Sequence, residues 1–199
     1  MGDERTDEQL MTRTGEGDLD AFGILVQRHH KRALNLAYRL SGDPELSRDI
    51  AQESFLRILK GARRYEARAR FSTFLHTVVR NLVIEMVRKR RRRHEATTSG
   101  VVDPPNGSPE SSVRVDGAAV PPDVMLERKE IRQRLQSALA TLPDDLRDAF
   151  VLTEIEGLSY RDVAEICDCP EGTIASRKHH AVEQLRRILT PYDQEKEQR

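Results

Sequence analysis

The chain has 199 residues, enough for one or two domains of ordinary size. No apolar run approaches the roughly 18 residues that would indicate a membrane span, and the acidic, polar start lacks the pattern of a secretory signal. Its two cysteines cannot form a disulfide framework, so we expect a protein of the reducing cytoplasm.

Charge is distributed unevenly along the chain. The formal net charge is zero, with 33 Lys and Arg against 33 Asp and Glu. Residues 57–93, however, hold 13 basic residues against two acidic ones, whereas residues 94–130 hold seven acids and three bases. Such polarised charge steers a protein toward a polyanion, so the zero net charge does not argue against nucleic-acid binding.

Apolar residues recur at helical spacing between residues 18 and 94, without a convincing strand. A first helix is expected over 20–40, ending at Ser41-Gly42. Asp43 is a good N-cap and Pro44 a good first helical residue, so a second helix is expected over 44–61. A basic loop follows, and a long third helix is expected over 72–93.

The second helix has more apolar residues than a single core-facing stripe requires. One stripe suffices to join a core: Ala51, Phe55, Ile58, Leu59 and Ala62. Other apolar residues lie off this stripe among charged ones: Leu46, Ile50 and Leu56, with Asp49, Glu53 and Arg57. This mixture favours a protein-binding face. The alternative is that Leu46 and Ile50 contact the N-terminal segment while Glu53 pairs with Arg57 at i,i+4, and the residues leave both open.

The third helix has a polar face that suits a nucleic-acid strand. Its apolar side comprises Phe74, Leu75, Val78, Val79, Leu82, Val83 and Met86. Opposite lie Thr73, Thr77, Arg80, Asn81, Ile84, Arg88 and Arg91. The helix ends in six consecutive basic residues, 88–93. A solvated helix end is the simpler interpretation of such a run, but six bases exceed what the helix dipole needs, which favours a phosphate anchor.

Residues 95–122 contain five of the nine prolines and no periodicity, which predicts a flexible linker. A second helical block follows over 123–191. Its expected helices lie near 123–140, 143–155, 159–167 and 171–189.

The last two helices have the pattern of a helix-turn-helix. Ser159 is placed to cap the first, and the sequence Cys-Asp-Cys-Pro at 167–170 breaks it. On the second helix Ile174, Ala181, Val182, Leu185, Ile188 and Leu189 share one side. The outer side carries Thr173, Ser176, Arg177, His180 and Arg187, which suit base edges and phosphates in a major groove. The alternative is an ordinary helical hairpin with a solvated basic face.

Two long stretches resemble one family. The sequence DPELSRDIAQESFLRILKGARRYEARARFSTFLHTVVRNLVIEMVRKRRRR resembles sigma region 2, and LPDDLRDAFVLTEIEGLSYRDVAEICDCPEGTIASRKHHAVEQLRRIL resembles sigma region 4. With only these regions and a linker, the chain resembles a bacterial extracytoplasmic-function (ECF) sigma factor, an initiation subunit of RNA polymerase. The resemblance implies an all-α fold with region 2 over 18–94, a linker over 95–122 that threads toward the RNA exit path, and region 4 over 123–191.

The resemblance also implies roles for matching residues. Three would bind the clamp helices of the polymerase largest subunit: Asp49, Gln52 and Glu53. The minus-ten element would be melted and read by Arg64, Tyr65, Arg68, Arg70, Phe71, Thr73, Thr77, Arg80, Asn81 and Arg88. The minus-thirty-five element would be read by Glu171, Thr173, Ser176, Arg177, His179 and His180. Further expected partners are the polymerase flap, promoter DNA and an anti-sigma factor; no cofactor is expected.

The chain departs from the family pattern mainly in the recognition helix. Ala175 stands where a basic residue is frequent, Lys178 occupies an apolar position and must snorkel, and His179-His180 replaces an apolar residue and Arg. Promoter sequence therefore does not transfer from relatives.

Three other classes of protein compete with this interpretation. A metal or redox sensor would use Cys167, Cys169, His179 and His180, but this spacing is poor for a tetrahedral zinc site. A free-standing helix-turn-helix repressor would leave the second and third helices unexplained. An enzyme is the weakest of the three, because the sequence contains no Gly-rich phosphate loop, GxSxG or HExxH motif.

Overall fold

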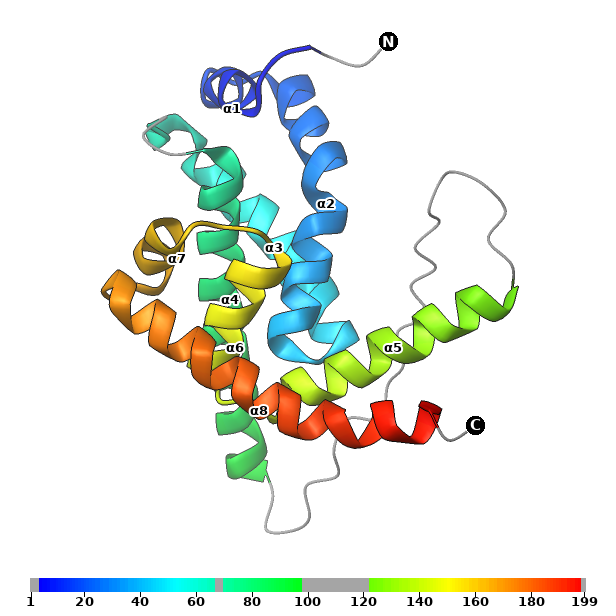
Figure 1. Cartoon of the computed structure of the whole chain (residues 1–199). Helices are drawn as coiled ribbons and strands as arrows, with labels where there is room; N and C mark the ends of the chain where they lie inside the picture. Colours follow the sequence, from blue (N-terminus) through cyan, green and yellow to red (C-terminus); the bar gives the residue numbers. More distant parts are fainter. Residues whose placement is uncertain (1–3, 67–69, 98–121, 198–199) are drawn as a thin grey trace.

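The computed structural model describes residues 4–66, 70–97 and 122–197, which form helices and no strand, so the predicted all-α class is confirmed. The N-terminal block comprises α1 (Asp7–Gly15), α2 (Leu19–Ser41), α3 (Pro44–Gly61), a 3-10 turn (Ala62–Arg64) and α4 (Phe71–Thr97) (Figure 1). The C-terminal block comprises α5 (Pro122–Thr141), α6 (Asp144–Phe150), a π-helical turn (Val151–Ile155), α7 (Tyr160–Cys167) and α8 (Glu171–Glu197). Most of the predicted linker lies outside the described residues, so its flexibility stays a prediction. Among the helices described, none is both long and apolar enough to cross a membrane.

The corner between α2 and α3 forms as the sequence predicts. Gly42 ends α2 with a φ of 73°, a left-handed conformation that glycine adopts without steric cost. The Asp43 carboxylate then accepts hydrogen bonds from the backbone N–H groups of Glu45 and Leu46, at 2.9 and 3.0 Å, and Pro44 begins α3. This tight corner lays α3 back along α2.

Helix α1 was not predicted, and it extends the N-terminal block beyond the expected start at residue 18. Thr6 and Gln9 form a reciprocal capping box, which is the one sequence signal that indicates this helix. Leu10 and Met11 are fully buried. Gly15 is required here, because a Cβ at this position would lie 2.7 Å from the backbone oxygen of Ala62.

The core of the N-terminal block joins all four of its helices. Phe71, Leu75, Val79 and Leu82 of α4 are buried in it. Ile50 of α3 is also fully buried, so the interpretation of Ile50 as a surplus residue on a protein-binding face is wrong. Leu46 is half-buried against the same core, and only Leu56 of the three remains largely accessible, at 43%.

The C-terminal block holds the predicted helix-turn-helix. Ser159 caps α7 by accepting a hydrogen bond from the Asp162 N–H, at 3.1 Å. Asp168 ends α7 with a φ of 51°, the only non-glycine residue in the described part of the chain with a positive φ. Val163 of α7 and Ile174 and Leu185 of α8 are buried together under the turn.

The two blocks pack against each other. Helix α2 contacts α5 and α6, and α4 contacts α7 (Figure 1). At one end of this contact the Arg147 guanidinium donates to the carbonyl of Leu40 at 2.9 Å, and the Gln136 amide donates to the carbonyl of Tyr38 at 3.0 Å.

Candidate nucleic-acid and polymerase interfaces

The outer face of α3 presents the residues expected to bind polymerase. Asp49 and Gln52 are exposed, Glu53 is half-buried, and Leu56 continues the same face one turn further on. Their i, i+3, i+4 and i+7 spacing places them in one stripe of acidic, amide and apolar groups. This is a composition suited to a partner protein with basic and apolar groups.

Glu53 is held in place by an ion-pair network. Arg57 Nε donates to Glu53 at 3.1 Å, and Arg57 Nη1 lies 2.9 Å from Glu85 of α4. Hydrogen bonds from the Arg57 guanidinium hold the pKa of the Glu85 carboxyl below its ordinary value. The i,i+4 pair of the simpler alternative is therefore present, and it coexists with an exposed face at Asp49 and Gln52.

The loop before α4 brings several of the predicted minus-ten residues together. Arg64 and Arg70 are exposed at its two ends, and the half-buried ring of Tyr65 lies 5.5 Å from that of Phe74. Arg68 lies outside the described residues.

Phe71 and Thr73 do not face solvent, which corrects their predicted contact with DNA. Phe71 is fully buried with its ring 5.1 Å from that of His29, and its N–H donates to the Glu8 carboxylate at 3.0 Å. Thr73 is 6% exposed. Both residues lie on the inner side of the first turn of α4, so they anchor the helix; the helical pattern alone had placed Thr73 on the polar face.

The other minus-ten residues predicted on α4 differ in how accessible they are. Asn81 and Arg88 are exposed, whereas Thr77 is half-buried and its hydroxyl donates to the Thr73 carbonyl at 3.0 Å. Arg80 is held by the C-terminal block: Nε donates to Asp148 at 2.7 Å and Nη1 to the carbonyl of Ile166 at 3.2 Å.

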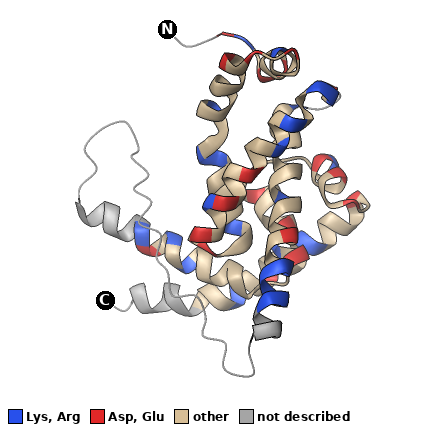
Figure 2. Ribbon diagram, turned by 180° about the vertical axis from the view of Figure 1, so that it is seen from behind, with Lys and Arg blue, Asp and Glu red and all other residues tan. Residues whose placement is uncertain are grey.

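The C-terminal end of α4 is strongly basic and projects from the body of the molecule (Figure 2). Residues 88–93 are all exposed. Arg90 is paired with Asp43, the N-cap of α3.

On α8 the predicted base readers fall into two groups. Glu171, Ser176, His179 and His180 are exposed, and His180 Nδ1 lies 3.8 Å from Glu183. Thr173 and Arg177 are half-buried. The Arg177 guanidinium lies 3.2 Å from Asp145 and 3.6 Å from the sulfur of Cys169, so it needs to leave these contacts before reaching DNA.

Lys178 shows how a basic residue is accommodated at an apolar position. Its ammonium lies 2.5 Å from Glu154 and donates to the Tyr160 hydroxyl at 3.1 Å. These hydrogen bonds raise the pKa of Lys178. The stem covers apolar surface while the charged end reaches the edge, as snorkelling requires.

The two cysteines behave as packing residues in this structure. Both are free thiols and half-buried, and burial raises the pKa of Cys167 to about 11. In the described parts of the chain, no three His, Cys, Asp or Glu side chains come close enough to share a metal ion.

Sequence reasoning missed two acidic residues of the C-terminal block, Asp148 and Glu156. Both side chains are nearly buried and contact cations of the N-terminal block. No local pattern distinguishes them from the many exposed acids of the chain, because their partners are distant in sequence.

The chain matches two known family models. Residues 25–93 match Sigma-70 region 2, and residues 132–185 match Sigma-70, region 4. The first match runs from within α2 through α3 into α4, and the second runs from α5 into α8, so one match falls in each helical block.

Relatives match along nearly the whole chain. The ECF RNA polymerase sigma factor SigE of Mycolicibacterium smegmatis is 34% identical over 97% of this chain and 71% of its own. The RNA polymerase sigma-H factor of Pseudomonas aeruginosa is 32% identical over 94% of this chain and 96% of its own. The ECF RNA polymerase sigma-E factor of Escherichia coli is 31% identical over 96% of this chain and 98% of its own.

Two solved structures share the fold. The sigma factor RpoE of Bartonella quintana, in complex with the anti-sigma factor NepR, has a TM-score of 0.68 and 24% identity over 85% of this chain and 96% of its own. CnrH in complex with the cytosolic domain of CnrY has a TM-score of 0.65 and 22% identity over 94% of this chain and 99% of its own. Taken with the two region matches and the relatives above 30% identity, the all-helical structure shows that this chain belongs to the family of ECF RNA polymerase sigma factors, which are initiation factors and not enzymes.

Proposed function

We propose that this sigma factor uses three separate surfaces during initiation. The outer face of α3, with Asp49, Gln52 and Glu53, binds the clamp helices of core RNA polymerase. The loop before α4 and the exposed face of α4 melt and hold the minus-ten element. Helix α8 reads the minus-thirty-five element, while the C-terminal block also contacts the polymerase flap.

The observation that carries the proposal is that two differently charged surfaces of the N-terminal block are both exposed. The stripe on α3 presents Asp49 and Gln52, whereas residues 88–93 form an exposed basic run at the end of α4. One surface can therefore complement a protein while the other neutralises phosphates, without competition between them.

Region 2 at residues 25–93 favours this function over that of a free-standing repressor. A repressor needs only the helix-turn-helix and gains nothing from the exposed stripe on α3. The proposal also includes an anti-sigma partner, because the sigma factor RpoE, which has a similar fold, is seen in complex with the anti-sigma factor NepR.

The test of the polymerase surface is a charge reversal at Asp49. Asp49→Arg adds a guanidinium to an exposed acidic stripe without changing the core, so we expect about tenfold weaker binding to core polymerase at unchanged helicity. Glu16→Arg, an equal change of charge at the exposed end of α1, is the matched control and should bind as the unmodified chain does. Equal affinity of the two variants for core would show that the α3 stripe is not the docking surface.

A further inference from the structure

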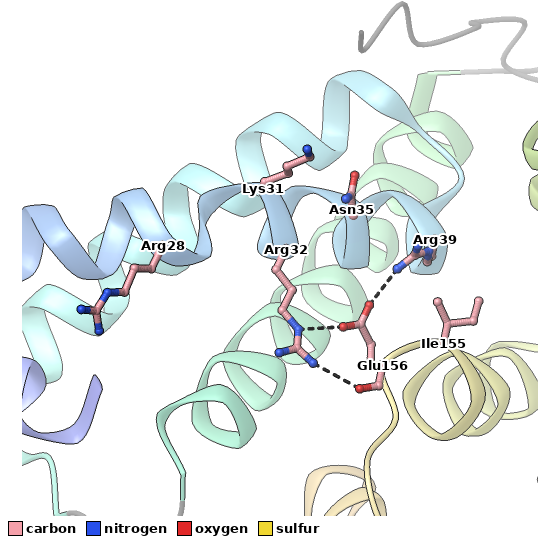
Figure 3. A pocket seen from close by; sticks show the side chains of 7 residues that line it. All are labelled: Arg28, Lys31, Arg32, Asn35, Arg39, Ile155 and Glu156. Atoms are coloured by element: carbon pink, nitrogen blue, oxygen red, sulfur yellow. Dashed lines mark hydrogen bonds and ion pairs between the residues drawn. The ribbon is translucent and has the colours of Figure 1, made fainter. Parts of the chain in front are cut away.

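A basic pocket lies along α2, beside the segment that follows the π-helical turn (Figure 3). Its volume is about 410 Å³, within the range of about 300–1,000 Å³ that is common for small-molecule sites. The side chains that α2 contributes are all hydrogen-bond donors: Arg28, Lys31, Arg32, Asn35 and Arg39. At about 100° per residue, these positions fall within a sector of about 100° on one face of the helix. The pocket therefore gathers the donors of α2 in one place.

Glu156 orients two of these guanidinium groups. Its side chain is 5% exposed, and it accepts hydrogen bonds from Arg32 Nε at 2.9 Å and from Arg39 Nη1 at 2.8 Å (Figure 3). Arg32 Nη2 also donates to the backbone carbonyl of Glu156, at 3.2 Å. Burial raises the pKa of Glu156, but the hydrogen bonds and charges of His76 and Arg32 outweigh this and lower it to about 2. The carboxylate is therefore ionised at neutral pH and holds both guanidinium groups in place.

The same two guanidinium groups keep donors for a ligand. An arginine side chain has five N–H donors in a planar fork, and the contacts with Glu156 engage only Nε and Nη2 of Arg32 and Nη1 of Arg39. The two side chains are 39% and 34% exposed, so their remaining donors are within reach of a molecule in the pocket. Donors that are already held in position cost less conformational entropy when a ligand binds.

Lys31 and Asn35 complete the set without partners of their own. In the part of the chain that the structure describes, neither side chain makes a hydrogen bond or an ion pair, and Lys31 is exposed. Arg28, in contrast, pairs with Asp7 of α1 at 2.9 Å. Because Glu156 offsets only one of the three remaining cations, the pocket keeps an excess of positive charge. A helix face that is merely solvated would not need a buried carboxylate to orient its guanidinium groups.

The composition of the wall indicates the chemistry of the ligand. Of the described residues that line the pocket, only Ile155 is apolar, so the wall offers little surface for an apolar group. Guanidinium and ammonium groups are the donors that bind phosphate oxygens most strongly. From Lys31 to Arg39 they extend over about 12 Å of helix axis, at about 1.5 Å per residue, so a linear ligand can contact more of them than a single phosphate can.

We propose that this pocket binds a phosphate chain, either a free polyphosphate or the triphosphate group of a nucleotide. Arg32 and Arg39, positioned by Glu156, donate to the phosphate oxygens together with Lys31 and Asn35. None of these residues belongs to the three surfaces proposed above for polymerase and promoter, so the site is tested independently of them.

Isothermal titration calorimetry of the full chain with sodium tripolyphosphate, at about 0.15 M salt to screen loose surface binding, tests the site. The unmodified chain should bind one tripolyphosphate in a saturable manner. Lys31→Ala with Asn35→Ala should weaken binding about tenfold at unchanged helicity, because neither side chain contacts another residue. The matched control is Lys129→Ala with Gln133→Ala, which removes an ammonium and an amide at the same spacing from exposed positions of α5. It should bind as the unmodified chain does.

Two further variants separate the pocket from general attraction to a polyanion. Lys31→Arg keeps the charge and should bind within a few-fold of the unmodified chain. Arg91→Ala with Arg92→Ala removes charge from the exposed basic run of α4 and should leave the affinity for tripolyphosphate unchanged. The proposal would be overturned by a lack of saturable binding to the unmodified chain, by equal losses in the Lys31 and Asn35 double variant and its control, or by a loss confined to the Arg91 and Arg92 variant.

The length of the phosphate chain and the source of the ligand are tested with two other probes. Orthophosphate should bind at least tenfold more weakly than tripolyphosphate, and equal affinities would contradict a site for a chain. ATP, titrated without magnesium, distinguishes the sources. An affinity equal to that of tripolyphosphate supports a site for the phosphate chain alone, whereas binding at least tenfold tighter supports the same site with a nucleotide as its ligand.

Discussion

At the scale of single residues, the recognition helix α8 separates side chains that are available to DNA from those that support the helix. Ser176, His179 and His180 are exposed, whereas Arg177 and Lys178 are engaged with carboxylates of neighbouring helices. Sequence periodicity placed Arg177 on the outer face, but periodicity does not reveal that Asp145 lies within reach and that Arg177 is half-buried. The first candidates for reading bases are therefore the hydrogen-bond donors of the outer face that are also exposed to solvent.

Replacing Ser176 and His180 by Ala should relax discrimination among upstream promoter elements. Each good base contact typically contributes about 1–3 kcal/mol of discrimination, so preference at one or two positions should fall by about tenfold or more. The measurement is run-off transcription on a library randomised at the upstream element. Thr190→Ala, an exposed change on the same helix, is the control, and an unaltered sequence preference in the double variant would exclude these residues as base readers.

Cys167 should be a poor nucleophile in the folded chain. Burial raises its pKa to about 11 from an ordinary value of 9.0, so at neutral pH its thiolate is about 100-fold scarcer than in an unfolded chain. Alkylation by iodoacetamide in a Cys169→Ser background should accelerate about 100-fold on unfolding. Equal rates in the folded and unfolded chain would contradict this and would reopen a redox role for this thiol.

At the scale of elements, α4 combines a buried stripe, a polar stripe that we propose faces DNA, and a basic end. The apolar spacing of α4 predicted its core side, and Leu75, Val79 and Leu82 are indeed buried. The spacing failed at the first turn, where Thr73 is buried although the helical pattern places it on the polar side. Helix α1 was not predicted, because two apolar residues, Leu10 and Met11, are too few to show a helical period.

Replacing Arg91, Arg92 and Arg93 by Ala should weaken holoenzyme binding to all promoter sequences about equally. The slope of log affinity against log salt reflects the number of phosphates that the protein neutralises, at about 0.9 for each, so the slope should become shallower by about 2–3. Arg90 is left in place because its pair with Asp43 supports the start of α3. The control is Lys129→Ala with Arg132→Ala, at two exposed positions of α5. A defect confined to one promoter sequence would instead identify the basic run as a base reader.

At the scale of the whole molecule, the family match and the two-block organisation follow from sequence, but the contact between the blocks does not. Asp148 and Glu156 meet cations that are 68 to 124 residues away in the chain. Such pairings have no local signature, since an acid that will be buried by a distant helix looks like any surface acid. The candidate DNA and polymerase residues came from the sequence and its resemblance to a family, whereas the contact that engages Arg80 required the structure.

The contact between the blocks should weaken in acid. The pKa of Glu156 is lowered from an ordinary 4.5 to about 2, so its contribution is fully present above pH 4.5 and disappears as the pH falls toward 2. A shift of this size corresponds to at most about 3 kcal/mol. The free energy of unfolding of the unmodified chain should therefore exceed that of Glu156→Gln at pH 5, and the two values should converge below pH 4.5. A difference that does not depend on pH would argue against an ionised Glu156 in the contact.

Helix α1 holds both ends of the loop that precedes α4. At one end, Gly15 allows α1 to approach the backbone of Ala62, and at the other the Glu8 carboxylate accepts the N–H of Phe71. That hydrogen bond lowers the pKa of Glu8, so the tie is strongest when the carboxylate is charged. Fixing the two ends of a segment lowers the conformational entropy that remains to be lost when a ligand binds. In the function proposed for this loop, a base turned out of the promoter duplex meets a receptor whose two ends are already held, and α1 is then the part of the chain that lowers the entropic cost of capturing the base.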